Sequence, residues 1–222
     1  MAVQPKLVEL VQDAILAEIA AGKLAPGERI VQEQIAKDLG VPRQPVQQAL
    51  QVLRSMGVLC EAADRGLLVA PLDLEHVRNM YDMRAVIEGL AFRKAAERNA
   101  SRAASEGPAL IAAGRRAVAR GAVADMIEAD VAFHDFIYEL SGNPLVAPAM
   151  DAHWTNTQRV MGEVLLRDET PRDVWDQHEA LLAAVAAGDG PAAERLARHH
   201  VDQAADFMIA RLQRESEEPD TL

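Results

Sequence analysis

Residues 39–69 read LGVPRQPVQQALQVLRSMGVLCEAADRGLLV, and this stretch decides the fold of the first part of the chain. Apolar residues at helical spacing predict a helix over 42–56 whose buried stripe is Val46, Leu50 and Leu53. Its two prolines fall in the first turn, where backbone N–H groups have no intrahelical partner. The segments 58–60 and 67–70 then predict two short strands joined by a tight turn.

Two further helices precede this stretch. Apolar residues recur every three or four positions from Leu7 to Ile19, and a shorter helix is expected over 31–40 after the connection GKLAPGERI. Helices followed by a strand pair predict a winged helix-turn-helix over residues 1–72, a fold that places one helix in the major groove of DNA. The outer face of that helix is rich in amides and arginines: Arg43, Gln44, Gln47, Gln48, Gln51 and Arg54. Arginine can pair with guanine and glutamine with adenine, although such a face can also be merely solvated.

From residue 73 onward the only periodicity is helical, so the fold class is mostly α, with an antiparallel bundle of about six helices over 73–214. The expected helices are 73–99, 106–120, 122–140, 144–166, 171–187 and 190–214. Each break contains Gly or Pro, as at Gly107-Pro108. Residues 215–222 are expected to form a frayed tail.

Charge and hydropathy limit the possible classes of protein. The net charge is −11, which argues against uniform affinity for nucleic acid. Residues 1–72 are nearly balanced, with seven Lys/Arg against eight Asp/Glu, so the acidity lies in the second part. Since no apolar run approaches the roughly 20 residues of a membrane span and the start lacks a signal peptide, we expect a cytoplasmic protein that does not enter a membrane. The single Cys60 lies in an apolar run and is expected to be a small core residue.

The first part of the chain resembles the N-terminal domain of the GntR family of bacterial regulators. The matching features occur in order over about 65 residues: GKLAPGERI, LGVPRQPV, the AL that follows and RGLLV. The resemblance implies DNA contacts from the recognition helix and from the wing tip. With the outward-facing Gln48 added, the predicted DNA-binding residues are Arg43, Gln44, Gln47, Gln48, Arg65 and Gly66.

The chain departs from that family's pattern at several positions. Pro42 stands where the family usually has Ser, and Gln47 where it usually has a second arginine. Gln32 and Glu33 replace a Glu and a basic residue. Because each cationic contact with a phosphate adds to affinity, these changes predict weaker nonspecific binding and an altered operator.

Four residues of the second part suggest a metal site. Asp130 and His134 are four apart on one helix and therefore project from the same face. His178 and His200 lie on two later helices among Leu and Ala residues. One carboxylate and three imidazoles suit a divalent ion, with Zn²⁺ expected first and Ni²⁺, Mn²⁺ or Fe²⁺ as alternatives. Taken alone, lone histidines are more often ordinary core or surface residues.

The segments YDMRAVIEGLA, DVAFHDFIYELSGN, HEALLAAVAAGD and AAERLARHH resemble the FCD ligand-binding domain of the FadR-type GntR subfamily. In metal-binding members of that subfamily an Asp and a His on one helix and two later histidines bind the ion. This implies Asp130, His134, His178 and His200 as ligands, with His199 as a competitor for the last place.

The same resemblance places Arg84 at the effector cavity, where its guanidinium could hold a carboxylate. The alternative is a simple helical pair between Arg84 and Glu88. Asn143 is the second predicted effector-binding residue, with helix capping as its alternative role. His153, Trp154 and Asn156 are weaker candidates for the same pocket.

The sequence therefore predicts a homodimeric transcription factor, a repressor more often than an activator, that binds a double-stranded operator and a small carboxylate effector. It is not expected to be an enzyme. Two rivals stay open: a metal-dependent hydrolase, since an open metal position can activate water, and a regulator for which the metal itself is the signal.

Overall fold

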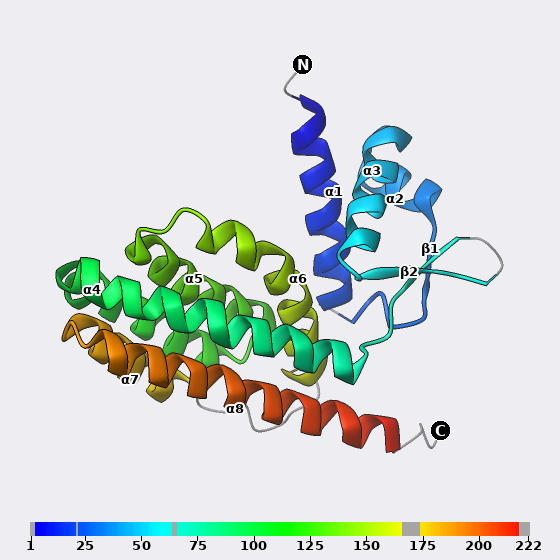
Figure 1. The fold of residues 1–222 in the computed structure, drawn as a ribbon. Helices are drawn as coiled ribbons and strands as arrows, with labels where there is room; N and C mark the ends of the chain where they lie inside the picture. Colours follow the sequence, from blue (N-terminus) through cyan, green and yellow to red (C-terminus); the bar gives the residue numbers. More distant parts are fainter. Residues whose placement is uncertain (1–2, 21, 64–65, 166–173, 218–222) are drawn as a thin grey trace. The chain divides into compact units, whose positions relative to one another are not determined.

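The structure is a computed structural model that describes residues 3–20, 22–63, 66–165 and 174–217 (Figure 1). These residues form two compact units. Unit 1 comprises Met1–Leu72 and Thr155–Glu163, and unit 2 comprises Asp73–Trp154 and Val164–Leu222.

Unit 1 contains the three helices expected from the sequence. They are α1 (Val3–Ala20), α2 (Gln32–Asp38) and α3 (Arg43–Ser55). Helix α1 begins four residues before the predicted Leu7, and α3 starts directly after Pro42. The predicted stripe of α3 is buried and packs in one core with residues from α1 and the strands: Val11, Ile15, Ile19, Ile30, Val46, Ala49, Leu50, Leu53, Val58, Leu59 and Val69.

A small antiparallel sheet completes the winged fold. Strands β2 (Leu59–Glu61) and β3 (Leu67–Val69) form the predicted wing. A third strand, β1 (Arg29–Ile30), pairs with the other edge of β3, so that the order is β1-β3-β2. This strand was not predicted, because two residues are too few to show a period-two pattern.

Unit 1 also includes part of helix α6 (Val146–Leu165). Arg159 donates from Nη2 to the carbonyl of Ala70 at 2.6 Å. Asn156 donates from Nδ2 to the carbonyl of Met56 at 2.8 Å. The Asn156 amide is therefore bound within unit 1, and the suggestion that it serves an effector pocket gains no support.

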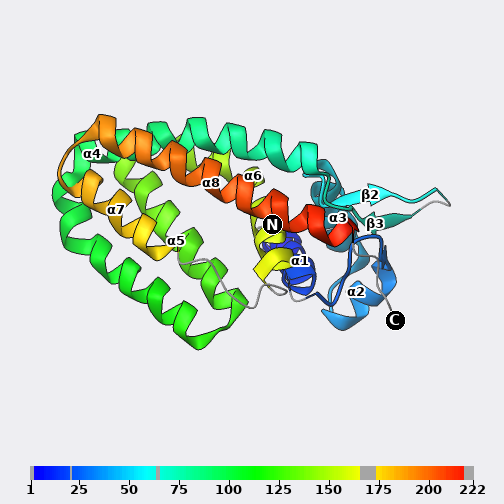
Figure 2. The same ribbon diagram turned by 90° about the horizontal axis from the view of Figure 1, so that it is seen from below.

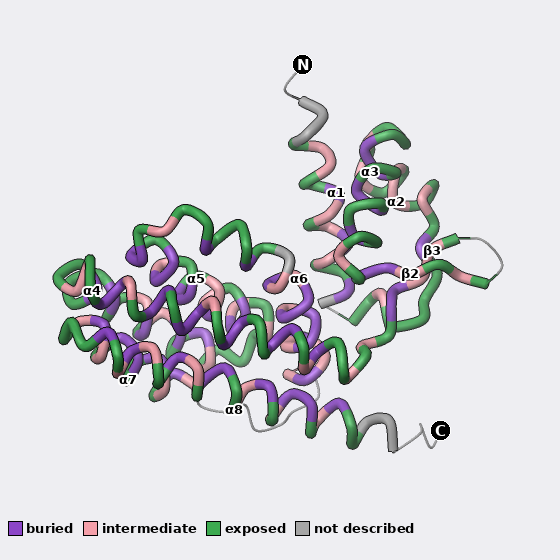
Figure 3. The backbone as a smooth tube through the Cα atoms, viewed as in Figure 1, coloured by how far each residue is buried: buried purple, intermediate pink, exposed green. Residues whose placement is uncertain are grey.

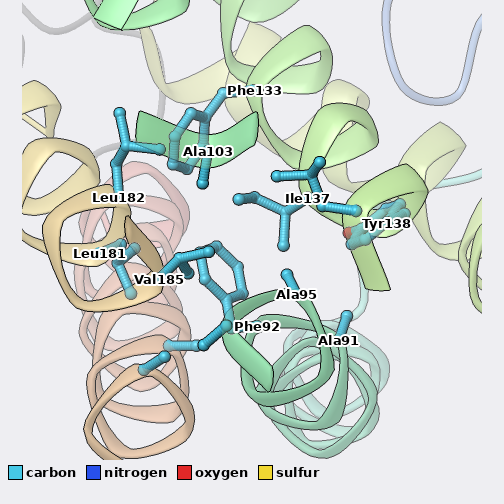
Figure 4. Packing of buried hydrophobic residues seen from close by; sticks show 14 of the residues in the cluster. Ala91, Phe92, Ala95, Ala103, Phe133, Ile137, Tyr138, Leu181, Leu182 and Val185 are labelled. Carbon is cyan, nitrogen blue, oxygen red and sulfur yellow. The ribbon is translucent and has the colours of Figure 1, made fainter. Parts of the chain in front are cut away.

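In unit 2 the long helix α4 (Leu74–Arg120) packs against α5 (Val123–Ser141), α7 (Trp175–Ala186) and α8 (Gly190–Glu217). Figures 1 and 2 both show α8 running beside α4. Buried positions recur along the inner sides of these helices (Figure 3). Figure 4 shows apolar side chains of α5, α7 and α4 meeting in the core, among them Phe133, Leu181 and Phe92.

The predicted break at Gly107-Pro108 is wrong. Helix α4 continues through both residues and departs from helical geometry only at Asn99, with φ −137° and ψ 34°. Asn99 Nδ2 donates to the carbonyl of Leu140 at 2.7 Å, and Arg98 donates to the carbonyl of Ser141, so contacts with the end of α5 accompany the kink. Residues 100–105, expected to be a connection, are helical.

Glycine is required within α4 for packing. A Cβ atom on Gly107 would collide with the Leu182 side chain, and one on Gly114 would collide with the Trp175 ring. Because these two glycines have no side chain, α7 can approach α4 closely. This close approach positions His178, which lies three residues after Trp175 on α7.

The remaining helix boundaries lie within a few residues of prediction. Helix α8 extends to Glu217, three residues into the expected frayed tail, and 218–222 lie outside the described residues. Residues 171–173, at the start of the predicted helix 171–187, also lie outside the described residues. Within the described ranges, none of the helices combines the length and apolarity that a bilayer span requires.

Candidate functional site

The recognition surface of unit 1 lies on α3. Four of the predicted DNA-binding residues are exposed on it: Arg43, Gln44, Gln47 and Gln48. A groove runs between α3 and the wing, lined by Gln47, Gln51 and Arg54 on one side and by wing residues on the other. Polar side chains along a helix beside such a groove can reach base edges or phosphates.

The wing tip contributes Gly66, which is exposed and has a φ of +132°, a backbone conformation that favours glycine. The Arg29 guanidinium of β1 lies against it, 2.9 Å from the position of a hypothetical Cβ. A side chain at position 66 would therefore disturb both the backbone and Arg29. Arg65, the other predicted wing contact, lies outside the described residues.

Sequence reasoning did not predict two ion pairs on this surface. Glu33 Oε1 lies 2.8 Å from Nη2 of Arg43, and Glu61 Oε1 lies 2.6 Å from Nη1 of Arg54. Both arginines of the recognition helix are thus paired within the protein. The departure at position 33 was visible in the sequence, but the pairing depends on how α2 packs beside α3.

Three predicted metal ligands come together in unit 2. His134 of α5, His178 of α7 and His200 of α8 are all buried, and one ring nitrogen of each lies within 4.8 Å of the others. The Nε2 atoms of His178 and His200 are 3.2 Å apart. His199 is exposed, so the geometry favours its neighbour His200.

A divalent metal fits this cluster. Two nitrogens bound to one tetrahedral Zn²⁺ at about 2.0 Å lie roughly 3.3 Å apart, which is close to the spacing of His178 and His200. That contact is also a hydrogen bond when one ring carries the proton. His134 Nε2, however, is buried with no hydrogen-bond partner among the described residues, and such an atom costs about 1–3 kcal/mol unless a ligand satisfies it.

Asp130 lies beside the cluster, with Oδ1 3.5 Å from Nε2 of His178. Burial raises the pKa of Asp130 above its ordinary value, because a charge there is poorly solvated. Burial, followed by the neighbouring His200, lowers the pKa of His178 well below its usual range. The His178 ring is therefore neutral at pH 7, which is the form that binds a metal.

Arg84 and Glu88 form the predicted helical pair, but they form it in the interior of unit 2. Arg84 Nε donates to Glu88 Oε1 at 2.8 Å, and the two side chains are only 5% and 0% exposed. The guanidinium also lies over the rings of Trp154 and Tyr81, at 4.6 and 5.0 Å from their centroids. A cation held between aromatic rings beside three histidines is suited to an anionic ligand.

Two side chains outside the predicted ligand set contact the histidines. Glu88 Oε2 lies 2.6 Å from His134 Nδ1, and Gln177 Oε1 lies 2.7 Å from His200 Nδ1. The first contact is short but poorly aligned for a hydrogen bond, so we describe it by its distance alone. Sequence reasoning assigned Glu88 only to Arg84 and did not consider Gln177, although it directly precedes His178.

The other effector candidates are less closely tied to the cluster. Asn143 Oδ1 accepts a hydrogen bond from the backbone N–H of Leu145, which is the capping role considered as its alternative. Its contact with an effector stays a prediction. His153 is half-buried, and burial, then Arg84, lowers its pKa. Of the weaker candidates, Trp154 packs against the cluster, with its ring centroid 5.2 Å from that of His134.

Comparison with known proteins agrees with both halves of this description. Residues 7–69 match the gntR family of bacterial regulatory proteins, and residues 79–203 match the FCD domain. A probable D-xylose utilization operon transcriptional repressor from Paenarthrobacter nicotinovorans is 27% identical over 191 residues, covering 86% of this chain and 84% of that protein. The transcriptional repressor RspR from Escherichia coli strain K12 is 24% identical and covers 83% and 81%.

Solved structures show the same fold. McbR/YncC from E. coli superposes with a TM-score of 0.78 at 22% identity, covering 92% of this chain and 97% of that one. A putative GntR regulator from Rhodococcus sp. RHA1 gives 0.76 at 21% identity, covering 95% and 99%. The family matches and relatives are transcriptional regulators, not enzymes. The chain therefore belongs to the gntR family of DNA-binding transcriptional regulators, with an FCD domain as its effector-binding part.

Proposed function

We propose that this regulator is a homodimeric repressor whose operator binding is controlled by a small carboxylate metabolite at a divalent-metal site in unit 2. The observation that carries the proposal is the convergence of His134, His178 and His200 from three helices, with a buried His134 nitrogen that has no hydrogen-bond partner among the described residues. Asp130 is the proposed fourth ligand. Zn²⁺ is the first expectation, with Ni²⁺, Mn²⁺ and Fe²⁺ as alternatives.

The carboxylate class of the effector follows from Arg84. This cation is nearly inaccessible to water, so an anion that reaches it forms a charge-assisted hydrogen bond in a poorly screened environment. A bound divalent ion would offer a second, open position to the same carboxylate. Asn143 is proposed as a further effector contact on the family resemblance alone.

Control of DNA binding by the effector requires that the effector bind one state of the dimer better than the other. A ligand with equal affinity for both states does not shift the equilibrium between them. The proposed DNA contacts are Arg43, Gln44, Gln47, Gln48, Arg65 and Gly66. Two copies of unit 1 in a homodimer would contact a two-fold-symmetric operator.

The proposal is tested in two steps. Metal content is first measured on purified protein, and an operator is selected from a random oligonucleotide pool. Binding to that operator is then titrated with a panel of mono-, di- and tricarboxylates in the presence of saturating Zn²⁺. Release of DNA by one carboxylate supports the proposal. If every carboxylate leaves DNA binding unchanged, the effector class is wrong.

A second candidate is a regulator for which the metal itself is the signal, and the buried histidine cluster favours it equally well. It predicts that operator affinity follows free Zn²⁺ with no organic ligand present. A metal that only completes the effector site predicts no further change in operator affinity once the site is filled. A free-metal titration buffered by chelators separates the two.

A further inference from the structure

Glu88 contacts two functional groups at once. It lies on α4 one turn after Arg84, and its side chain is 0% exposed. Its Oε1 accepts from Arg84 at 2.8 Å, while its Oε2 lies 2.6 Å from Nδ1 of His134 on α5. One carboxylate therefore touches both the proposed effector-binding cation and a proposed metal ligand.

The surroundings favour a charged Glu88. The Arg84 guanidinium, 2.8 Å away and 5% exposed, is a buried cation that stabilises the carboxylate form. A buried carboxylate is tolerated only when it is paired, and here Oε1 accepts from Arg84 while Oε2 lies 2.6 Å from Nδ1 of His134. Replacing either partner would leave the charge of Glu88 partly uncompensated.

The orientation of His134 follows from this contact. Nδ1 lies 2.6 Å from Glu88 Oε2, and the other ring nitrogen, Nε2, is buried with no hydrogen-bond partner among the described residues. His200 has the same arrangement, because its Nδ1 lies 2.7 Å from Gln177 Oε1 while its Nε2 faces His178. In two histidines of the cluster, a side-chain oxygen thus lies within 2.7 Å of Nδ1, and Nε2 is the nitrogen on the other side of the ring.

We propose that Glu88 is a positioning residue that serves both halves of the site: it orients His134 for the metal and is the counter-ion with which an effector carboxylate competes for Arg84. An anion approaching Arg84 weakens the Arg84–Glu88 pair, and the freed carboxylate then acts more strongly on His134. Effector and metal affinities are thereby coupled, and the coupling is reciprocal. This inference rests on the metal and effector site proposed above.

The decisive variant is Glu88→Gln, which keeps the shape and removes the charge. Loss of such a supporting contact typically weakens metal binding by about 10–100-fold. We expect the Zn²⁺ affinity of Glu88→Gln to fall within that range, as measured by competition with a chromophoric chelator. Glu97→Gln is the matched control, since Glu97 forms the same i,i+4 pair with Arg93 on the same helix but on the surface. It should bind Zn²⁺ as the wild type does.

A second readout does not require metal. In the metal-free protein, nitrogen chemical shifts of ¹⁵N-labelled histidine should show a proton on Nδ1 of His134, and Glu88→Gln should reduce that preference. Glu88→Asp retains the charge but retracts it by one methylene, so it serves if the Gln variant does not fold. It should also weaken Zn²⁺ binding, by less than the Gln variant does.

The outcomes are distinguishable. If wild type binds Zn²⁺ and Glu88→Gln binds it equally well, Glu88 has no positioning role, while the proposed metal site stands. If wild type binds no Zn²⁺, Ni²⁺, Mn²⁺ or Fe²⁺, the proposed function fails. The histidine spectra then decide the orienting role alone, and an Nδ1 signal of His134 that is unchanged in the Gln variant overturns it.

Discussion

Each of the two units contains an Arg–Glu ion pair, but one pair is exposed and the other is buried. On the recognition surface, Arg43 and Glu33 are 71% and 69% exposed, whereas Arg84 and Glu88 in unit 2 are 5% and 0% exposed. An exposed pair is screened by water and salt, so its arginine can exchange partners with a phosphate at little cost. A buried pair is costly to break, so only a ligand that replaces the lost partner can do so. An exposed arginine that can exchange its partner suits DNA binding, and a buried arginine that only a matching anion can reach suits selective recognition of an effector.

The largest expected effect compares the two arginines directly. Arg84→Met leaves Glu88 buried without its main partner, and we expect it to lower the unfolding free energy by about 3–5 kcal/mol. Arg43→Met should lower it by less than about 1 kcal/mol. Urea denaturation of both variants in the presence of a chelator measures the difference. Equal losses would mean that burial does not distinguish the two pairs.

The next effect concerns metal. Zn²⁺ at 100 times its dissociation constant should raise the unfolding free energy of the wild type by about 2.7 kcal/mol, because the folded cluster binds the ion. His178→Ala should abolish that increase, as followed by thermal denaturation with and without chelator. His199→Ala is the control, since this exposed neighbour of His200 should keep the increase. A full response in His178→Ala would exclude His178 as a ligand.

A smaller effect is expected at the recognition helix. Arg43→Ala should weaken binding to the selected operator by about 1–3 kcal/mol if its guanidinium pairs with a guanine, measured by fluorescence anisotropy. Arg116→Ala removes an exposed arginine of α4 and should leave the affinity unchanged. If Arg43→Ala weakens binding to all sequences alike, Arg43 contacts phosphate and does not read a base.

The smallest effect tests the exposed pair itself. Glu33→Gln frees Arg43 from its ion pair and removes a negative charge near the DNA phosphates. The affinity for DNA should therefore rise roughly a few-fold at low salt, and this gain should shrink as salt is added. Glu128→Gln, on the exposed side of α5, is the charge-matched control. Weaker binding by Glu33→Gln would instead show that Glu33 contacts the DNA, for example a cytosine amino group.

Part of this site was predictable because some of its residues lie within one turn of each other on a single helix. The spacing of Asp130 and His134 places both on one face of a helix whatever surrounds it. The relation of Arg84 to Glu88 is local in the same way. The convergence of His178 and His200 with His134 was suggested by their residue types and rested mainly on the family resemblance, since no local pattern relates residues on three different helices. Gln177 could have been noticed as the neighbour of a candidate ligand, but its partner, His200, lies on another helix.

By itself, the sequence determined the order and approximate bounds of the helices, the wing, and the outward face of α3. Periodicity and capping residues act over a few positions, so these features can be read locally. Only the tertiary structure decided that the helix predicted to end at residue 99 resumes directly after a kink at Asn99 and continues through Pro108, that β1 joins the sheet, and that Glu88 faces His134. Each depends on a contact between residues distant in sequence, where packing outweighs local preference.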